Sequence, residues 1–271
     1  MSIQWYPGHM HKAKREIIEA MPVVDVVIEV LDARIPRSSE NPLIGSISQN
    51  RPTLKVLNKC DLADPEVTAL WLSSMKETVA VSLSDSLGAK AVIARCRKLA
   101  PDRGTTLKPL RIMILGIPNV GKSTLINHLA SRRAAKVADE PAVTKMQQKV
   151  ELEKGLLLVD TPGITWPKFE NEAGYRLAVT GAIGKNAMDV VEVASFAADY
   201  LVSNYPGLIR SRYGIDSGEG HDLVEKIGRQ RGCLKSGGLV DMEKASQALL
   251  QEFRSGKIGR ISLEKPTSEP K

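Results

Sequence analysis

The sequence predicts an α/β fold, in which a mostly parallel sheet carries helices on both faces and is followed by a smaller all-α C-terminal domain. Short runs rich in Val, Ile and Leu alternate with helical patterns in the first part of the chain. Polar or glycine-containing loops follow several of these runs, as in open sheets that bind ligands at the carboxyl ends of their strands. We therefore expect a sheet domain over residues 1–172 and a helical domain over residues 173–271.

The composition of the 271-residue chain allows a large aliphatic core and favours a polyanionic partner. Hydrophobic residues make up 42% of the chain and aromatic residues only 4%, so Val, Ile, Leu and Ala must form most of the core. The formal net charge is +7, and positive charge attracts polyanions such as nucleic acids. A merely basic enzyme without such a partner is the alternative that charge alone leaves open.

The cysteines and the N-terminus indicate a cytoplasmic protein. Cys60, Cys96 and Cys233 are scattered and form no C-x-x-C pair, which argues against a disulfide framework or a zinc site. The first residues lack the apolar core of a signal peptide, and no apolar run is long enough to cross a membrane. We expect neither secretion nor a membrane partner.

An aromatic and basic segment, residues 3–15, leads into a predicted helix. Apolar residues from position 10 to position 21 have helical spacing, and Pro22 ends the helix. The β-rich run that follows, residues 23–31, ends in a charged loop at residues 32–37. His9 lies at a turn just before the helix, where a capping or surface role is the plain alternative to a catalytic one.

The next strand, residues 53–57, delivers the pattern N-K-x-D at residues 58–61. The Asp61 carboxylate can accept hydrogen bonds from the N1–H and the 2-amino group of guanine, whereas adenine would leave it unpaired. Asn58 can contact the O6/N7 edge, and the aliphatic stem of Lys59 can lie over the base. The pattern therefore predicts a guanine site at the end of this strand.

A helix at residues 65–72 and a strand at residues 78–81 come next, and this strand ends in small polar residues. Backbone N–H groups near Ser82 are suited to support the guanine base, although a serine-containing loop is generic by itself. A basic helix at residues 88–99 then leads to a connector at residues 101–106.

The stretch G-I-P-N-V-G-K-S at residues 116–123 fits the phosphate-binding pattern G-x-x-x-x-G-K-[ST], and a chance match on an ordinary turn is the alternative. An apolar run at residues 110–115 precedes it and a helical segment follows, which is the context that the pattern requires. Backbone N–H groups and the helix N-terminus favour phosphate oxygens there. Lys122 can reach the β- and γ-phosphates, and the Ser123 hydroxyl can bind Mg²⁺. We assign nucleotide binding to Asn119, Val120, Gly121, Lys122, Ser123 and Thr124.

Residues that respond to the γ-phosphate are expected after this loop. Residues 136–149 show no regular pattern. Thr144 within them can bind Mg²⁺ when a triphosphate is present, unless it is an ordinary loop threonine.

Two strands, near residues 149–152 and 156–159, lead to the pattern D-T-P-G. There Asp160 is placed to hold Mg²⁺, and the Gly163 N–H to bond the γ-phosphate. Ile164 stands where many GTPases have a water-orienting glutamine. We therefore expect hydrolysis without a partner to be slow.

The rest of the chain shows helical patterns near residues 187–202, 222–231 and 241–253. Basic residues outnumber acidic ones between residues 205 and 260, which suits contact with RNA but is also typical of a solvated helix face. We expect residues 266–271 to form an unstructured tail.

The order of the motifs is rotated relative to the usual GTP-binding domain, in which the phosphate loop comes first. Here the guanine pattern at residues 58–61 precedes the phosphate loop at residues 116–123. The same parts can still build one parallel sheet, because the ends of a domain lie close together and can be joined. A join near residues 101–107 predicts a circularly permuted P-loop GTPase domain.

With these motifs the chain resembles the ribosome biogenesis GTPase A (YlqF-type) family of circularly permuted GTPases. The likeness covers nearly the whole chain and includes W-Y-P-G-H-M (5–10), D-A-R-I-P (32–36), R-G-C-L (231–234) and F-R-S-G-K-I-G-R (253–260). The resemblance implies a Mg²⁺-dependent enzyme that binds GTP and GDP, hydrolyses GTP, and is stimulated by ribosomal subunits and K⁺. It also implies binding to the large ribosomal subunit and its rRNA late in assembly, helped by the helical domain. No DNA partner is implied, and the protein would be a monomer off the ribosome.

Two residues gain a role from this resemblance alone. Asn119 matches the asparagine that helps hold K⁺ beside the phosphates in potassium-stimulated GTPases. His9 matches a histidine proposed to assist hydrolysis in place of the missing glutamine. The catalytic group is then Lys122, Thr144, Gly163 and His9. One departure is Ala142, where the family often has glycine near its switch threonine.

Two other functions remain open on the sequence. A small-molecule phosphotransferase or ATPase could use the same phosphate loop, although N-K-x-D speaks against ATP. A binding module could hold GTP as a structural ligand without turnover, which Ile164 in place of glutamine permits.

Overall fold

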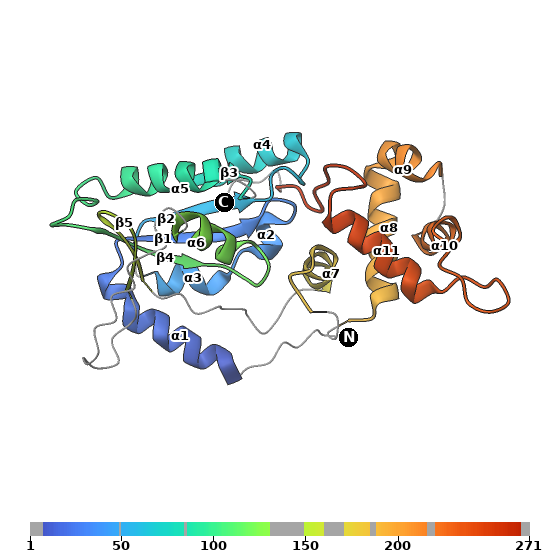
Figure 1. The fold of residues 1–271 in the computed structure, drawn as a ribbon, viewed down its shortest axis with the longest axis horizontal. Coiled ribbons are helices and arrows are strands. Elements are labelled where there is room, and N and C mark those ends of the chain that lie inside the picture. The colour runs from blue at the N-terminus through green and yellow to red at the C-terminus, as the bar shows by residue number, and fades with distance from the viewer. Residues whose placement is uncertain are drawn as a thin grey trace.

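The structure, a computed structural model, describes residues 8–48, 50–83, 86–130, 149–159, 171–184, 188–215 and 220–266. Figure 1 shows a part built around a sheet on one side, helices α8 to α11 on the other, and α7 between them. One large apolar cluster contains residues from both parts, so the two share a core. None of the described helices has the length and apolar character needed to cross a membrane.

The described strands form one sheet in the order β3-β2-β1-β4-β6-β5. All neighbouring strands are parallel except β5 and β6, which form an antiparallel pair. The sequence therefore predicted the mostly parallel sheet correctly. The bounds are β1 Val26–Asp32, β2 Thr53–Asn58, β3 Thr78–Val81, β4 Leu110–Leu115, β5 Lys149–Glu153 and β6 Leu156–Val159.

Strand β1 lies between β2 and β4, and this placement builds the site. Asp32 at the end of β1 pairs with Asn58 at the end of β2, and Glu29 pairs with Leu115 of β4. The carboxyl ends of β2, β1 and β4 therefore meet at one edge of the sheet. That edge brings the loop after residue 58 close to the loop after residue 115, although the two are far apart in the sequence.

Helices cover both faces of this sheet, as the sequence predicts. Alternate residues of β1 point to opposite faces, so that Val27 and Ile28 belong to different apolar clusters. One face packs against α1 (Gly8–Ala20), α3 (Pro42–Ile47) and α4 (Pro65–Ser74). The other face packs against α5 (Ser86–Leu99) and α6 (Lys122–Ala130).

Local chemistry sets several of these boundaries. A 3₁₀ turn at Met21–Val23, which contains Pro22, separates α1 from β1, so β1 begins at Val26 and not at residue 23. Helix α4 begins after Asp64, whose carboxylate accepts hydrogen bonds from the N–H groups of Glu66 and Val67. The short helix α2 (Pro36–Ser39) follows β1 directly.

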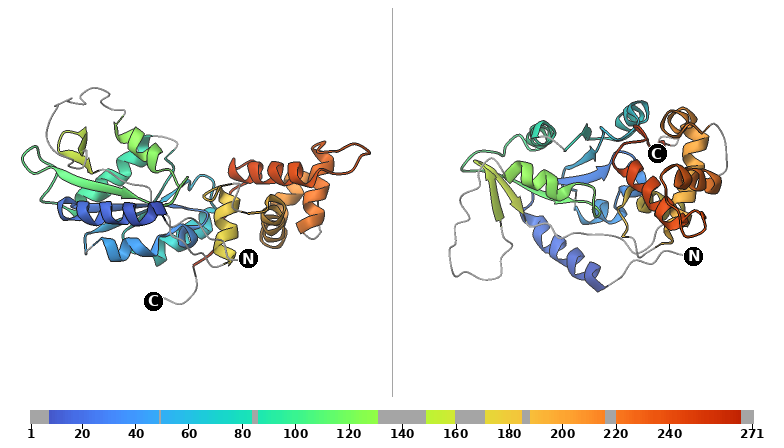
Figure 2. Two further views of the ribbon diagram at one scale, coloured as in Figure 1. Left: turned by 90° about the horizontal axis from the view of Figure 1, so that it is seen from below. Right: turned by 45° about the vertical axis from the view of Figure 1, so that its right-hand side comes forward.

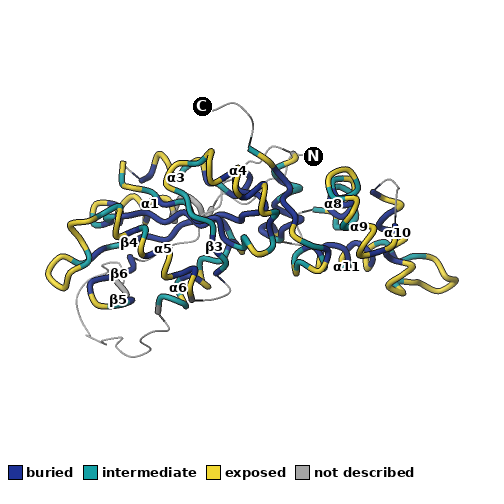
Figure 3. Tube along the Cα trace, turned by 90° about the horizontal axis from the view of Figure 1, so that it is seen from above, coloured by how far each residue is buried: buried dark blue, intermediate teal, exposed yellow. Residues whose placement is uncertain are grey.

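The helical part consists of α7 (Asn171–Thr180), α8 (Val190–Asn204), α9 (Pro206–Tyr213), α10 (Gly220–Gln230) and α11 (Met242–Arg254). The buried faces of α8, α10 and α11 pack against one another, as the dark blue stretches of Figure 3 show. The sequence patterns predicted these three helices but not α7 and α9. Both missed helices are short, so packing against their neighbours contributes much of their stability.

After α11 the chain leaves the helices and returns to the sheet part. Figures 1 and 2 show this dark red stretch running from α11 toward the sheet. Ile258, Ile261 and Leu263 are buried along it, and the indole N–H of Trp71 in α4 donates to the Glu264 carbonyl at 3.3 Å. This return of the chain was not predicted from the sequence. The tail was expected at residues 266–271, and all of it after Pro266 lies outside the described residues.

Candidate functional site

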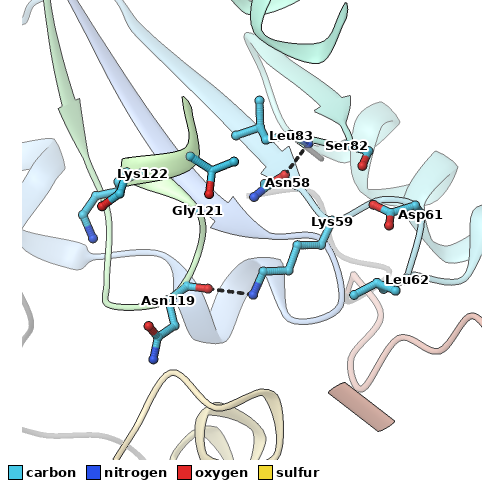
Figure 4. Close-up of a pocket in the computed structure, with 11 residues that line it drawn as sticks. Asn58, Lys59, Asp61, Leu62, Ser82, Leu83, Asn119, Gly121 and Lys122 are labelled. Atoms are coloured by element: carbon cyan, nitrogen blue, oxygen red, sulfur yellow. Dashed lines mark hydrogen bonds between the residues drawn. The ribbon is translucent and has the colours of Figure 1, made fainter. Parts of the chain in front are cut away.

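A cavity of about 450 Å³ opens at the carboxyl edge of the sheet (Figure 4). Three loops line it: those that follow β2, β3 and β4. The cavity thus brings together most of the residues to which the sequence assigned nucleotide binding. Its lining residues are Asn58, Lys59, Asp61, Leu62, Ser82, Leu83, Asn119, Gly121, Lys122, Ser123 and Thr124.

The backbone of the loop after β4 has positive φ angles at Gly116, Asn119 and Gly121. Gly116 and Gly121 have φ of 147° and 108°, values that side-chain-bearing residues avoid. A Cβ atom at Gly121 would overlap the amide nitrogen of Asn58, so only glycine fits there. Asn119 adopts φ 61°, a left-handed conformation that asparagine tolerates better than most residues. Val120 is buried, and its contribution is its backbone.

Lys122 is the first residue of α6, and its ammonium folds back onto the loop. Its Nζ donates a 2.6 Å hydrogen bond to the Ile117 carbonyl. Burial lowers the pKa of Lys122 to about 8, because the charged ammonium loses contact with water. Phosphate oxygens near this nitrogen would favour its charged form. Ser123 and Thr124 follow in the same helical turn, exposed at the cavity.

Asn58 joins the three loops. Its Nδ2 donates to the Val120 carbonyl at 2.6 Å, and its Oδ1 accepts from the Leu83 N–H at 2.9 Å. The carboxamide is 4% exposed. The structure thus shows Asn58 fixing the cavity walls to one another, while its contact with the guanine O6/N7 edge stays a prediction.

Lys59 spans the mouth of the cavity toward the phosphate loop. Its backbone is left-handed, with φ 63°. Its Nζ donates to the Asn119 carbonyl at 2.7 Å, as Figure 4 shows, and to Asp32 Oδ2 at 3.0 Å. The aliphatic stem therefore runs across the space beside Asp61, which suits its predicted position over a base.

Asp32 and Arg34 form a buried ion pair behind Lys59. The Arg34 guanidinium donates to Asp32 at 2.9 Å through Nε and at 2.7 Å through Nη2. Burial alone would raise the pKa of Asp32, but the charges of Arg34 and Lys59 outweigh it and hold that pKa well below its usual range. The charged loop after β1 is visible in the sequence, but neither residue was predicted to belong to the site. The feature that could have indicated them is the acidic residue at the carboxyl end of a buried strand, where open α/β sheets bind ligands.

The Asn119 side chain links the phosphate loop to the helical part. Its Nδ2 donates to the Gly181 carbonyl at 2.7 Å, just beyond the end of α7. Carbonyl oxygens, such as those of an amide side chain and of loop peptides, are ligands that K⁺ accepts in place of its hydration shell. The role of Asn119 in holding K⁺ stays a prediction.

The donor set at the loop also fits Mg²⁺. Mg²⁺ usually binds only one or two protein ligands, and phosphate oxygens and waters fill its other positions. The exposed Ser123 hydroxyl can be one of these protein ligands. Among the described residues no group of His, Cys, Asp or Glu could hold a metal ion by itself. Thr144 and Asp160, assigned to Mg²⁺, and Gly163 lie outside the described residues. His9 lies in the first turn of α1, and the structure does not describe its side chain.

A phosphate loop and an N-K-x-D loop on one mostly parallel sheet define a P-loop GTP-binding protein, here with its motifs in circularly permuted order. A family model described as "50S ribosome-binding GTPase" matches residues 111–212. That range begins in β4 and leaves the N-K-x-D strand outside it, in agreement with the permuted order.

The relatives extend the match to the whole chain. Ribosome biogenesis GTPase A of Priestia megaterium is 44% identical and covers 98% of this chain and 98% of that protein. The Thermotoga maritima protein of the same name is 33% identical over 97% of this chain and 95% of its own. The crystal structure of GNP-bound YlqF from T. maritima has a TM-score of 0.68 at 29% identity, covering 94% of this chain and 98% of that one. The chain belongs to the ribosome biogenesis GTPase A family.

Proposed function

We propose that this protein is a Mg²⁺-dependent GTPase that binds the large ribosomal subunit and acts late in its maturation. The observation that carries the proposal is the cavity in which Asp61 and Lys122 line the same space. The Asp61 carboxylate is suited to the guanine edge, and the Lys122 ammonium is suited to the phosphates. The two relatives described above are both named ribosome biogenesis GTPase A, which supports a role in ribosome assembly.

In this proposal each residue acts on a defined part of the nucleotide. Asp61 accepts the N1–H and 2-amino hydrogens, and the Lys59 stem covers the base. Lys122 and the N–H groups of the loop and α6 neutralise the β- and γ-phosphates. Gly163 bonds the γ-phosphate, and His9 orients the attacking water.

Two cations complete the site. Mg²⁺, held by Ser123, Thr144 and Asp160, and K⁺, held by Asn119, supply positive charge to the phosphate oxygens as charge develops in the transition state. The absence of a glutamine at Ile164 supports slow turnover by the protein alone and stimulation by its ribosomal partner.

Contact with rRNA is assigned to the helical domain, residues 173–271. The net charge of +7 supports a polyanionic partner, and basic side chains such as Arg210, Lys235 and Lys257 are exposed there. Phosphate contacts of this kind predict an association that weakens as salt rises. A cytoplasmic protein that is a monomer off the ribosome fits this role.

The decisive experiment combines binding and turnover. Co-sedimentation with purified large and small ribosomal subunits is measured with GDP, GTP and a non-hydrolysable GTP analogue, and phosphate release is measured in K⁺ and in Na⁺. We expect GTP-dependent binding to the large subunit and faster release with that subunit in K⁺. Release that subunits do not accelerate would contradict the ribosome-linked part. No release under any condition would favour a module that holds GTP without turnover.

A further inference from the structure

The turn that carries Asp61 is held by the C-terminal segment of the chain. Arg260 lies in the segment that follows α11, and its guanidinium contacts the backbone of this turn. Its Nη2 donates to the Cys60 carbonyl at 2.8 Å and its Nε to the Ala63 carbonyl at 2.9 Å. The two accepting carbonyls stand on either side of Asp61, so one side chain bridges the turn.

Neighbours of Arg260 add to the same contact. The Ile261 N–H donates to the Leu62 carbonyl at 2.9 Å, and the Asp64 N–H donates to the Ser262 hydroxyl at 3.2 Å. Three carbonyls of this turn, those of residues 60, 62 and 63, therefore accept hydrogen bonds from the C-terminal segment. The segment is also close-packed here, because a Cβ at Gly256 would lie 2.7 Å from Leu62 Cδ2.

The turn needs this support because its own bonds are few. It leaves β2 through Lys59 in a left-handed conformation, which lysine disfavours. Among the described residues of the sheet part, two backbone hydrogen bonds join this turn: the Leu62 N–H donates to the Lys59 carbonyl at 2.9 Å, and the Cys60 N–H donates to the Val81 carbonyl at 3.3 Å. Asp61 itself is exposed at the cavity, so the backbone around it must fix its position.

We propose that Arg260 is a positioning residue for guanine recognition, which holds the turn at residues 60–63 so that the Asp61 carboxylate meets the N1–H and the 2-amino group together. The inference rests on the proposed role of Asp61. Arg260 does not line the cavity, and it acts on the base only through the backbone of the turn.

This role makes a prediction that a general structural role does not. Two simultaneous hydrogen bonds to one carboxylate depend on its position, so a loosened turn should lose selectivity for the 2-amino group first. Hypoxanthine has the N1–H but lacks that group. The phosphate loop is held by Asn58 and Lys59 and not by Arg260, so phosphate binding should be preserved.

The test compares Arg260→Met, which keeps most of the aliphatic stem, with the wild-type protein. Dissociation constants for GDP, IDP and inorganic pyrophosphate are measured by calorimetry. We expect GDP to bind about tenfold more weakly, the preference for GDP over IDP to fall several-fold, and pyrophosphate to bind as before. Because Arg260 is exposed, its replacement leaves no buried cavity, and thermal melting checks that the variant is folded.

Two further variants sharpen the comparison. Arg254→Met is the matched control, since Arg254 also donates to two carbonyls, those of Ala178 and Val179, but to none in the guanine turn. It should keep the wild-type preference for GDP over IDP. Arg260→Lys, which can reach one carbonyl but not both, should restore part of that preference.

An unchanged GDP-to-IDP preference in folded Arg260→Met would overturn the inference, and so would an equal loss of pyrophosphate and GDP binding. Asp61→Asn separates this failure from that of the proposed guanine site. If Asp61→Asn binds GDP normally, the guanine assignment fails and the inference falls with it. If Asp61→Asn loses GDP while Arg260→Met does not, the positioning role alone is wrong.

Discussion

The Asn58 side chain donates a 2.6 Å hydrogen bond to the Val120 carbonyl, which ties the strand of the guanine pattern to the phosphate loop. Its carboxamide oxygen accepts from the Leu83 N–H at 2.9 Å, so the loop after β3 joins the same contact. These three loops are the walls of the cavity. A single buried amide thus ties the predicted guanine-binding loop to the predicted phosphate loop.

Replacing Asn58 with alanine should therefore destabilise the protein and weaken nucleotide binding. The change leaves the Val120 carbonyl and the Leu83 N–H without this partner in a buried place, at a cost of about 2–4 kcal/mol. Urea unfolding measures the loss. Asn204→Ala is the matched control, because the Asn204 amide donates to the Tyr200 carbonyl at an exposed position. A midpoint for Asn58→Ala equal to that of the control would contradict the prediction.

Binding of GDP should weaken as the pH rises through the pKa of Lys122. Burial lowers that pKa to about 8 in the free protein, and a bound diphosphate raises it again because it favours the ammonium. Binding therefore takes up a proton, and affinity should fall about threefold to fourfold between pH 7 and pH 8.5. Calorimetry in buffers of different ionisation enthalpy measures the uptake.

Lys122→Arg is the control for this pH dependence, since a guanidinium stays charged throughout the range. Its affinity for GDP is expected to be lower but flat between the two pH values, with no proton uptake linked to this position. Equal GDP affinities for the wild-type protein at pH 7 and pH 8.5 would refute the assigned pKa.

Glu29 should make the folded protein less stable as the pH rises toward neutrality. It is 2% exposed in β1, and burial raises its pKa to about 7, although the Asn41 N–H bond acts in the opposite direction. Because the carboxyl pKa is higher in the folded protein, protonation of Glu29 stabilises the fold. This contribution is fully present at pH values below 4.5, the pKa of the unfolded chain, and is lost as the pH rises through 7. Relative to Glu29→Gln, the wild-type protein should lose about 2–3 kcal/mol of unfolding free energy between pH 5 and pH 8.

Urea unfolding of both proteins across that pH range provides the measurement. The glutamine variant keeps a similar volume and can still accept from the Asn41 N–H, which bonds Glu29 Oε1 at 2.9 Å in the wild-type protein. Parallel stability curves for the two proteins would show that Glu29 is already ionised in the fold at pH 5.

Neutralising Asp32 should be among the most destabilising single changes at this edge of the sheet. Asp32→Asn leaves the Arg34 guanidinium, which is 1% exposed, without its carboxylate partner. Removing one member of a buried ion pair costs about 3–5 kcal/mol. Glu19→Gln breaks the exposed pair with Arg15 instead and should stay within about 0.5 kcal/mol of the wild-type protein. Similar unfolding free energies for the two variants would contradict the prediction.

Much of the fold was predictable because its signals are local. The apolar runs gave β1, β2, β3, β4, β5 and β6 with small errors at their ends, and helical spacing gave α8, α10 and α11. The errors fall where packing outweighs local pattern. α7 and α9 are short helices, and residues 256–265 form neither a helix nor a strand, so no periodic pattern reveals their path.

By itself the sequence determined the chemistry of the nucleotide site and the rotated order of its parts. The phosphate loop with Lys122 and the N-K-x-D pattern are each a short contiguous motif, so the residue types and spacing within each motif indicate which ligand groups it suits. Only the tertiary structure decided which residues hold that chemistry in place. Asp32 reaches Lys59, Asn119 reaches Gly181, and Arg260 reaches the turn at Asp61 across long stretches of chain. Such contacts arise from packing of distant elements, and no short pattern in the sequence encodes them.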